Sequence, residues 1–290
     1  MLVYEVRFAI EIDFDKTRSR PAEIFATLGS MTEAFYQLDA NFAHSIDAKA
    51  AFDQRLDRLE EGSIVTWLIE QLIHPDDRPL GDRPSESAVL QYMDRARMTV
   101  LQDLEKVDRI DNSQSVVGIG NKIDRIADEL GVKKSLAYKQ PAALPLAQAI
   151  HDVADSANRL APNEIARCIG GSGEAPIPRG KIVSLEAIRD DLTEQTLSHE
   201  IDMVLKVKKP DYLGQSRWEV KHGSHPIDLS IEDKLWMDRF HNKQVILTPG
   251  DAIRATVRVT SRYSATGELI DENYQALRIQ EVIQGMLTDE

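Results

Sequence analysis

Apolar and polar side chains alternate along the last third of the chain, which is the pattern of β-strands with one buried and one solvated face. The apolar members are Ile201, Met203, Leu205 and Val207 in one run and Ile253, Ala255, Val257 and Val259 in another. Turn sequences separate such runs, and residues 233–242 fit one short helix. This pattern predicts a small antiparallel β-barrel over residues 196–290, similar in size to OB and SH3 barrels.

The N-terminal part, residues 1–80, predicts a β-α-β-β unit. Residues 2–14 alternate like a strand, and Pro21 then opens a helix at the position where a missing N–H costs nothing. Apolar residues recur along this helix at steps of three and four, at Ile24, Leu28, Met31, Phe35, Leu38 and Phe42. Such a stripe suits a sheet or a partner helix, and we predict that it forms an interface.

Residues 50–73 fit two patterns. Phe52, Leu56 and Leu59 have helical spacing, whereas the β-branched and aromatic residues after Gly62 favour a strand. We predict a hairpin that turns near Gly62-Ser63, because it would complete the β-α-β-β unit.

The middle of the chain, residues 81–165, predicts three helices. They run from Ser85 to about Val107, from Ser113 to Leu130, and from Pro145 to near Pro162. Small residues at 170–173 and prolines at 176 and 178 predict a linker within residues 166–195. The fold class expected from all these patterns is α+β, with a helical middle and a C-terminal barrel.

Composition narrows the class of protein. Hydrophobic residues make up 42% of the chain and charged residues 29%, as in ordinary globular proteins. No apolar run approaches the length of about 20 residues that a membrane helix needs, and the first residues lack the pattern of a signal peptide. The single Cys168 cannot form an intrachain disulfide. We therefore expect a cytoplasmic protein that contacts no membrane.

Two groups of residues are of types that can bind a metal ion. Glu11, Asp13 and Asp15 share one parity of the first strand, and hard divalent cations prefer such oxygen ligands. They equally fit a solvated strand face whose charges discourage edge pairing. His222 and His225 flank a Gly-Ser pair that is ordinary turn chemistry, and zinc would need two further ligands. We expect no cofactor.

Catalytic motifs are weak throughout. Gly118 and Gly120 form a GxG, but the third glycine and the following Lys-Ser/Thr of a phosphate loop are missing, so these glycines fit helix packing better. No G-x-S-x-G elbow occurs, and Cys168 has no specific histidine partner in the sequence. The sequence favours a non-enzymatic protein.

Basic residues concentrate in the predicted barrel, at Lys206, Lys208, Arg217, Lys221, Arg254, Arg258 and Arg262. Cations beside aromatics such as Tyr212 and Trp218 can bind single-stranded nucleic acid, with the cations at the phosphates and the rings stacked on the bases. Alternatively, Trp218 is a core residue and the arginines pair across strands with Asp202, Asp228 or Glu232. The formal net charge of −13 argues against general affinity for nucleic acid, although a local basic patch remains compatible with it.

These observations favour a non-enzymatic interaction or assembly protein of bacterial type, whose partner is another protein or a second copy of itself. The alternative is a nucleic-acid-binding protein that uses the basic face of the barrel. A metal-dependent hydrolase or nuclease built on Glu11, Asp13 and Asp15 is the third hypothesis.

Overall fold

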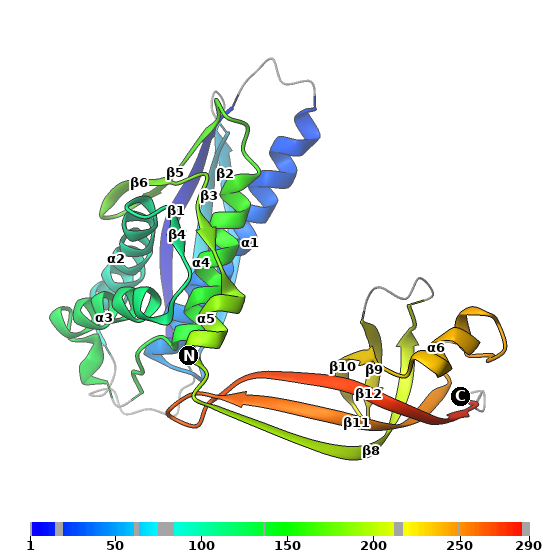
Figure 1. Ribbon diagram of the computed structural model, residues 1–290. Coiled ribbons are helices and arrows are strands. Elements are labelled where there is room, and N and C mark those ends of the chain that lie inside the picture. Colours follow the sequence, from blue (N-terminus) through cyan, green and yellow to red (C-terminus); the bar gives the residue numbers. More distant parts are fainter. Residues whose placement is uncertain are drawn as a thin grey trace. The chain divides into compact units, whose positions relative to one another are not determined.

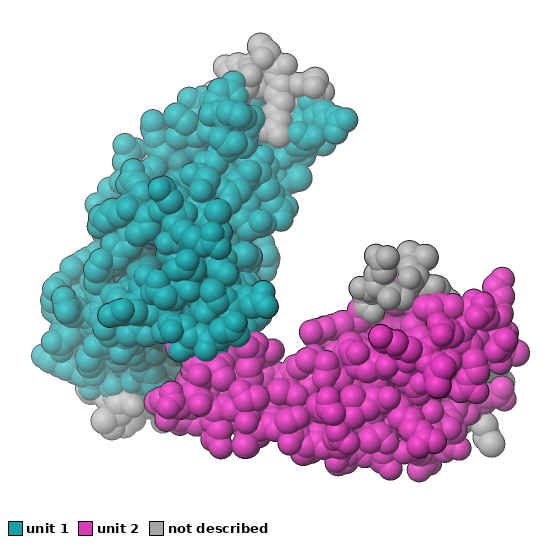
Figure 2. Space-filling model, viewed as in Figure 1, with its two compact units in different colours: residues 1–191 teal, residues 192–290 magenta. Residues whose placement is uncertain are grey.

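The protein consists of two compact units, residues 1–191 and residues 192–290, each with its own core (Figure 1 and Figure 2). The computed structural model describes residues 2–14, 20–60, 64–74, 84–135, 137–211, 217–248 and 250–285. Both helices and strands are abundant, which confirms the α+β class.

The first unit is built on a five-stranded antiparallel sheet. Its strands are β1 (Leu2–Asp13), β2 (Ala51–Glu60), β3 (Ile64–His74), β5 (Ile165–Gly170) and β6 (Gly173–Ile177), in the order β2-β3-β1-β5-β6. A separate two-stranded parallel sheet joins β4 (Arg109–Ile110) and β7 (Ile182–Val183). The pairing of β2 with β3 confirms the hairpin predicted over residues 50–73.

The helices of this unit are α1 (Pro21–Ile46), α2 (Glu86–Glu105), α3 (Ser113–Glu129), α4 (Ala143–Asn158) and α5 (Leu185–Leu192), with a short 3₁₀ helix, η2 (Val132–Lys134). The Ser85 hydroxyl caps α2 by accepting from the Ala88 N–H, and the Asn112 side chain caps α3 in the same way through Ser115. Gly131, at a φ of 74°, follows the end of α3, where a left-handed residue suits glycine. The three predicted helices of the middle region are therefore confirmed.

Alternation along β1 separates a buried face from an exposed one. Tyr4, Val6, Phe8, Ile10 and Ile12 are buried, while the side chains of Glu5, Arg7 and Asp13 are exposed. The helices pack on the buried face, where Phe8 and Phe35 of α1 bring their ring centroids to 5.7 Å.

The helical stripe predicted as an interface is instead part of this core. Ile24, Met31, Phe35, Leu38 and Phe42 are all at most 5% exposed, and Leu28 is half-buried. The sheet and α4 cover the stripe from within the same chain, so the interface prediction for these six residues is wrong.

The segment predicted as a linker is also folded. β5 pairs with β1 and β6 pairs with β5, so residues 165–177 form two strands of the main sheet (Figure 1). Ala166, Cys168, Ala175 and Ile177 supply the buried side chains of this hairpin, and Gly173, at a φ of 122°, follows its turn. The glycines thus make a tight connection within the sheet, and the second unit begins at Leu192.

The second unit is a closed five-stranded barrel, which confirms the prediction for the C-terminal region. Its strands are β8 (Gln195–Lys209), β9 (Trp218–His222), β10 (His225–Ile231), β11 (Ala252–Tyr263) and β12 (Leu269–Ile283), closed in the order β10-β12-β11-β8-β9. Helix α6 (Lys234–His241) lies between the third and fourth of these strands. All pairs are antiparallel except β10 with β12, which is parallel.

Among the described residues, no helix is both long and apolar enough to span a membrane.

Candidate functional site

The three arginines of β11 lie in ion pairs on the outer face of the barrel sheet. Arg254 contacts Glu281 at 2.7 Å, Arg258 contacts Glu200 at 2.9 Å, and Arg262 contacts Asp271 at 2.8 Å. The sequence had offered ion pairing as the alternative to ligand binding, but with Asp202, Asp228 or Glu232 as partners. Each observed partner is the direct cross-strand neighbour of its arginine: Glu281 and Asp271 lie on β12, and Glu200 lies on β8.

Asp202 has a different role from the one predicted. Its carboxylate accepts hydrogen bonds from Thr256 Oγ1 at 2.7 Å and Gln280 Nε2 at 2.9 Å. These bonds, with the Thr256 bond the strongest cause, lower the pKa of Asp202. The three arginines and Thr256 of β11 are therefore paired with carboxylates, which leaves little positive charge to attract an anion.

The basic residues of β8 and β9 are arranged differently. Lys206 and Lys221 are direct cross-strand partners, and both point outward because their neighbours Val207 and Val220 fill the core. Within the part of the chain that the structure describes, no ion pair involves either lysine. Like charges placed opposite each other on a sheet are unfavourable unless an anion lies between them.

Three more cations lie near this pair, at Lys208, Lys209 and Arg217. Lys208 and Lys209 contact Glu219 at 3.1 and 3.8 Å, and these bonds lower the pKa of that carboxyl group. Arg217 precedes β9 and is exposed. We call Lys206, Lys208, Arg217 and Lys221 the β8–β9 cationic face.

The aromatic residue expected beside these cations belongs to the core. Trp218 is 1% exposed and packs edge-on against Trp236, with centroids 5.9 Å apart, and against Phe240 at 5.1 Å. Its ring therefore cannot stack on a nucleic-acid base. Tyr212 lies outside the described residues.

Two of the three predicted metal ligands on the first strand fall within the described residues. Glu11 lies 3.9 Å from Arg167, Asp13 is exposed, and Asp15 lies outside the described residues. His222 and His225 are cross-strand neighbours at the β9–β10 turn, where Gly223 has a φ of 59°. No group of three or more metal-ligating side chains occurs in the described part of the chain.

A cluster of buried charges, which the sequence analysis did not predict, lies in the first unit. Arg97 of α2 is fully buried and donates from Nε to Asp39 of α1 at 2.9 Å and from Nη2 to Glu70 of β3 at 2.9 Å. Its guanidinium carbon lies 3.9 Å above the centre of the Phe8 ring. Asp94 completes the cluster, 3.6 Å from Arg97 Nη1.

Burial controls protonation in this cluster. Desolvation raises the pKa of Glu70 well above its ordinary value, and the neighbouring Asp39 carboxylate adds to the rise while Arg97 opposes it. Desolvation likewise raises the pKa of the adjacent Cys168 thiol to about 12, so the thiol stays protonated and unreactive. The hydrogen bonds of the cluster join α1, α2 and the sheet. Because these groups are sealed from water, they are not placed to meet a substrate.

The charge cluster does have a sequence signal. Glu70 shares the parity of Leu68 and Leu72, both buried, and Asp39 directly follows Leu38 of the apolar stripe. Charged residues at core positions of an amphipathic pattern require a buried partner, and Arg97 is that partner.

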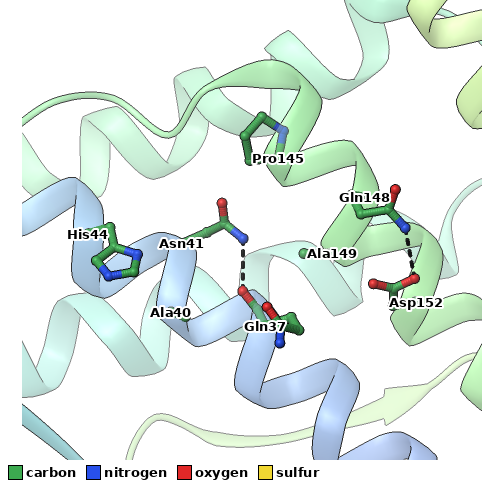
Figure 3. Close-up of a pocket in the computed structure, with 8 residues that line it drawn as sticks. All are labelled: Gln37, Ala40, Asn41, His44, Pro145, Gln148, Ala149 and Asp152. Carbon is green, nitrogen blue, oxygen red and sulfur yellow. Dashed lines mark hydrogen bonds between the residues drawn. The ribbon is translucent and has the colours of Figure 1, made fainter. Parts of the chain in front are cut away.

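A shallow depression of about 340 Å³ lies between α1 and α4 (Figure 3). Its lining comprises Gln37, Ala40, Asn41, His44, Pro145, Gln148, Ala149 and Asp152. The amides are already engaged on their own helices: Gln37 donates to Glu33, Asn41 to the Gln37 carbonyl, and Gln148 to Asp152. The hollow follows from small alanines at the helix contact and presents few polar groups to a ligand.

The glycines of the GxG motif lie inside α3. A side chain at Gly120 would approach Gln140 Nε2 to 3.3 Å, so this glycine allows close packing, as the sequence indicated.

Comparisons of the chain with protein-family models, with curated proteins and with solved structures found no match.

Proposed function

We propose that this is a cytoplasmic, non-enzymatic binding protein whose C-terminal barrel takes single-stranded nucleic acid on the β8–β9 cationic face. The observation that carries the proposal is the cross-strand pair Lys206 and Lys221, which lack a carboxylate partner among the described residues. An arrangement that is unfavourable in the free protein becomes favourable when a phosphate lies between the two ammonium groups.

The connectivity of the barrel supports this location. A helix between the third and fourth strands, together with a parallel contact between the third and fifth, is the arrangement of OB-type barrels. Such barrels bind oligonucleotides on the face of their second and third strands and on the adjoining loops. Here Lys221 lies on the second strand, Arg217 in the loop before it, and Lys206 on the neighbouring first strand.

The mode of binding follows from the buried state of Trp218. With this aromatic ring in the core, contacts from the cationic face are made mainly to phosphates rather than to base faces. Phosphate contacts give little sequence preference and a strong dependence on salt. The net charge of −13 makes the surrounding field repulsive, which increases that dependence.

Fluorescence anisotropy with labelled single-stranded oligonucleotides of mixed sequence tests the proposal, at several salt concentrations. Wild type should bind at low salt, and the Lys206→Glu/Lys221→Glu variant should bind at least about tenfold more weakly. Because each phosphate contact contributes about 0.7 to the salt slope on single strands, the slope should fall by about 1.4.

The matched control is Lys234→Glu/Arg239→Glu, which makes the same change in charge on α6. It should retain most of the affinity. Absence of binding by wild type at low salt, or an equal loss in the control, would exclude the β8–β9 cationic face as the binding site.

A further inference from the structure

The first part of β8 is an open edge of the barrel sheet. Residues 195–202 are exposed along their whole length, and they pair with β11 on one side only. Pairing with β9 on the other side begins at Lys206. In Figure 1, β8, β11 and β12 are seen to run on together beyond the short strands β9 and β10.

This edge lacks the features that usually prevent strand pairing. The β2 edge of the first unit has a bulge between Leu56 and Arg58 and alternating charges, and the β6 edge is five residues long and contains Pro176. By contrast, residues 195–203 contain no lysine, arginine or proline, and their register with β11 is unbroken. A long, flat edge of this kind is a template for another strand.

The edge also carries apolar side chains that nothing in the described part of the chain covers completely. Leu197 is 49% exposed and Ile201 is 48% exposed, and both lie on the face that continues into the barrel core at Met203. The opposite face carries Glu200 and Asp202, which are held by Arg258 and Thr256.

We propose that the partner of this edge is a second copy of the chain, with the two β8 strands paired antiparallel about a twofold axis at His199. Leu197 then lies opposite Ile201 of the second copy, and Glu200 lies opposite Ser198 of the second copy. The three strands β12, β11 and β8 of each copy join into one continuous sheet.

Avoidance of like-charge pairs selects this register. A twofold axis perpendicular to the sheet pairs only residues that point to the same face, so odd-numbered residues pair with odd and even with even. The axis therefore passes through a residue, and the neighbouring registers are centred on Ser198, Glu200 or Ile201. Centring on Glu200 places that carboxylate against itself, centring on Ile201 places Glu200 against Asp202, and centring on Ser198 places Glu194 against Asp202. Only the register at His199 avoids like charges and keeps the apolar residues together.

The test uses two reciprocal variants of the full-length protein, Leu197→Glu/Ile201→Glu and Leu197→Lys/Ile201→Lys. In the proposed register each variant places two pairs of like charges opposite each other and removes the apolar contacts. The dimer dissociation constant, measured by sedimentation velocity over a dilution series, should therefore rise by more than about tenfold. An equimolar mixture of the two variants should form a heterodimer, because every like-charge pair becomes an opposite pair.

His199→Glu and His199→Lys provide a second reciprocal pair if the double variants fold poorly, because this residue meets itself across the axis. Leu56→Lys/Leu59→Lys on the β2 edge is the matched control and should leave the association unchanged. A monomeric wild type, a dimer that survives both charge variants, or a mixture that stays monomeric would each overturn the proposal.

Dimer formation through β8 is independent of nucleic-acid binding. The Lys206→Glu/Lys221→Glu variant should remain dimeric, since both lysines lie outside residues 195–203.

Discussion

Arg97 donates from Nη2 to Glu70 across 2.9 Å, and both side chains are buried in the first unit. The same guanidinium bonds to Asp39, so one cation faces two carboxylates where water cannot screen them. Burial, and after it the nearby Asp39 carboxylate, raises the pKa of Glu70 well above its ordinary value, because two carboxylates ionised side by side there would carry a large cost.

Stability should therefore depend on pH through Glu70. The pKa of this carboxyl group is raised above its ordinary value of 4.5, so the folded state binds its proton more tightly than the unfolded chain does. Its contribution is complete below the unfolded pKa and is lost as pH rises through the folded pKa. The melting temperature of wild type should fall over this interval, whereas that of Glu70→Gln, which mimics the protonated acid, should fall less. Scanning calorimetry across pH, with Glu174→Gln as the exposed control, would refute this if the profiles of wild type and Glu70→Gln were parallel.

Removing the cation should be far more damaging than removing the whole cluster. Arg97→Met leaves Asp39 and Glu70 buried without compensation and should cost about 3–5 kcal/mol in the free energy of unfolding. Adding Asp39→Asn and Glu70→Gln to this variant should recover most of the loss. The carboxylate of the cluster that remains, Asp94, still accepts hydrogen bonds from the Gly171 and Ser172 N–H groups. Urea denaturation followed by circular dichroism measures both effects. No recovery in the triple variant would mean that the role of Arg97 is packing rather than charge.

Gly170 should tolerate no side chain. A Cβ there would overlap Asp94 Oδ1, the atom that accepts from the Gly171 N–H at 3.2 Å. Gly170→Ala should therefore displace the carboxylate that holds the β5–β6 turn, and lower stability by about 1–3 kcal/mol. Gly171→Ala is the matched control, because its Cβ would lie at an ordinary 3.8 Å from Asp94. Equal effects of the two substitutions on the midpoint of urea denaturation would disprove this role of Gly170.

Substitutions in the barrel core and on the β8–β9 cationic face should affect stability differently. Trp218→Ala removes a ring that packs against Trp236 and Phe240, and should destabilise the second unit by about 3–5 kcal/mol. Lys206→Glu/Lys221→Glu should leave thermal stability within about 0.5 kcal/mol of wild type, since both side chains are exposed. Thermal unfolding monitored by near-ultraviolet circular dichroism makes the comparison. A large loss in the lysine variant would show that its effect on binding arises from misfolding.

Helices and strands could be predicted wherever apolar residues recurred at one regular spacing over many residues. Alternation over residues 2–14 predicted β1 because that strand has one solvated face. The same reasoning failed at residues 165–177, where the strands are short and their core residues are mostly small. There the glycines and prolines of a tight hairpin looked like those of a flexible segment.

What covers each face of a helix or strand could not be predicted from the spacing of apolar residues alone. The stripe from Ile24 to Phe42 was identified correctly as apolar, but a pattern does not specify whether a sheet of the same chain or a partner covers it. The arginines of β11 were likewise placed on one face, whereas their partners depended on the registers of β11 with β12 and with β8. Which cations stay unpaired, as at Lys206 and Lys221, is a property of the tertiary fold.

The barrel closes through a narrow seam. The parallel contact of β10 with β12 spans three residue pairs, from Leu229 opposite Tyr274 to Ile231 opposite Ala276. Beyond it, Asp233 both caps α6 through the Trp236 N–H and accepts from the Ile279 N–H of β12. A single carboxylate thus fastens the helix and the end of the closure. Transient opening of the barrel should therefore start there and spread toward α6, while β11, which is paired on both sides, keeps its amides protected from exchange.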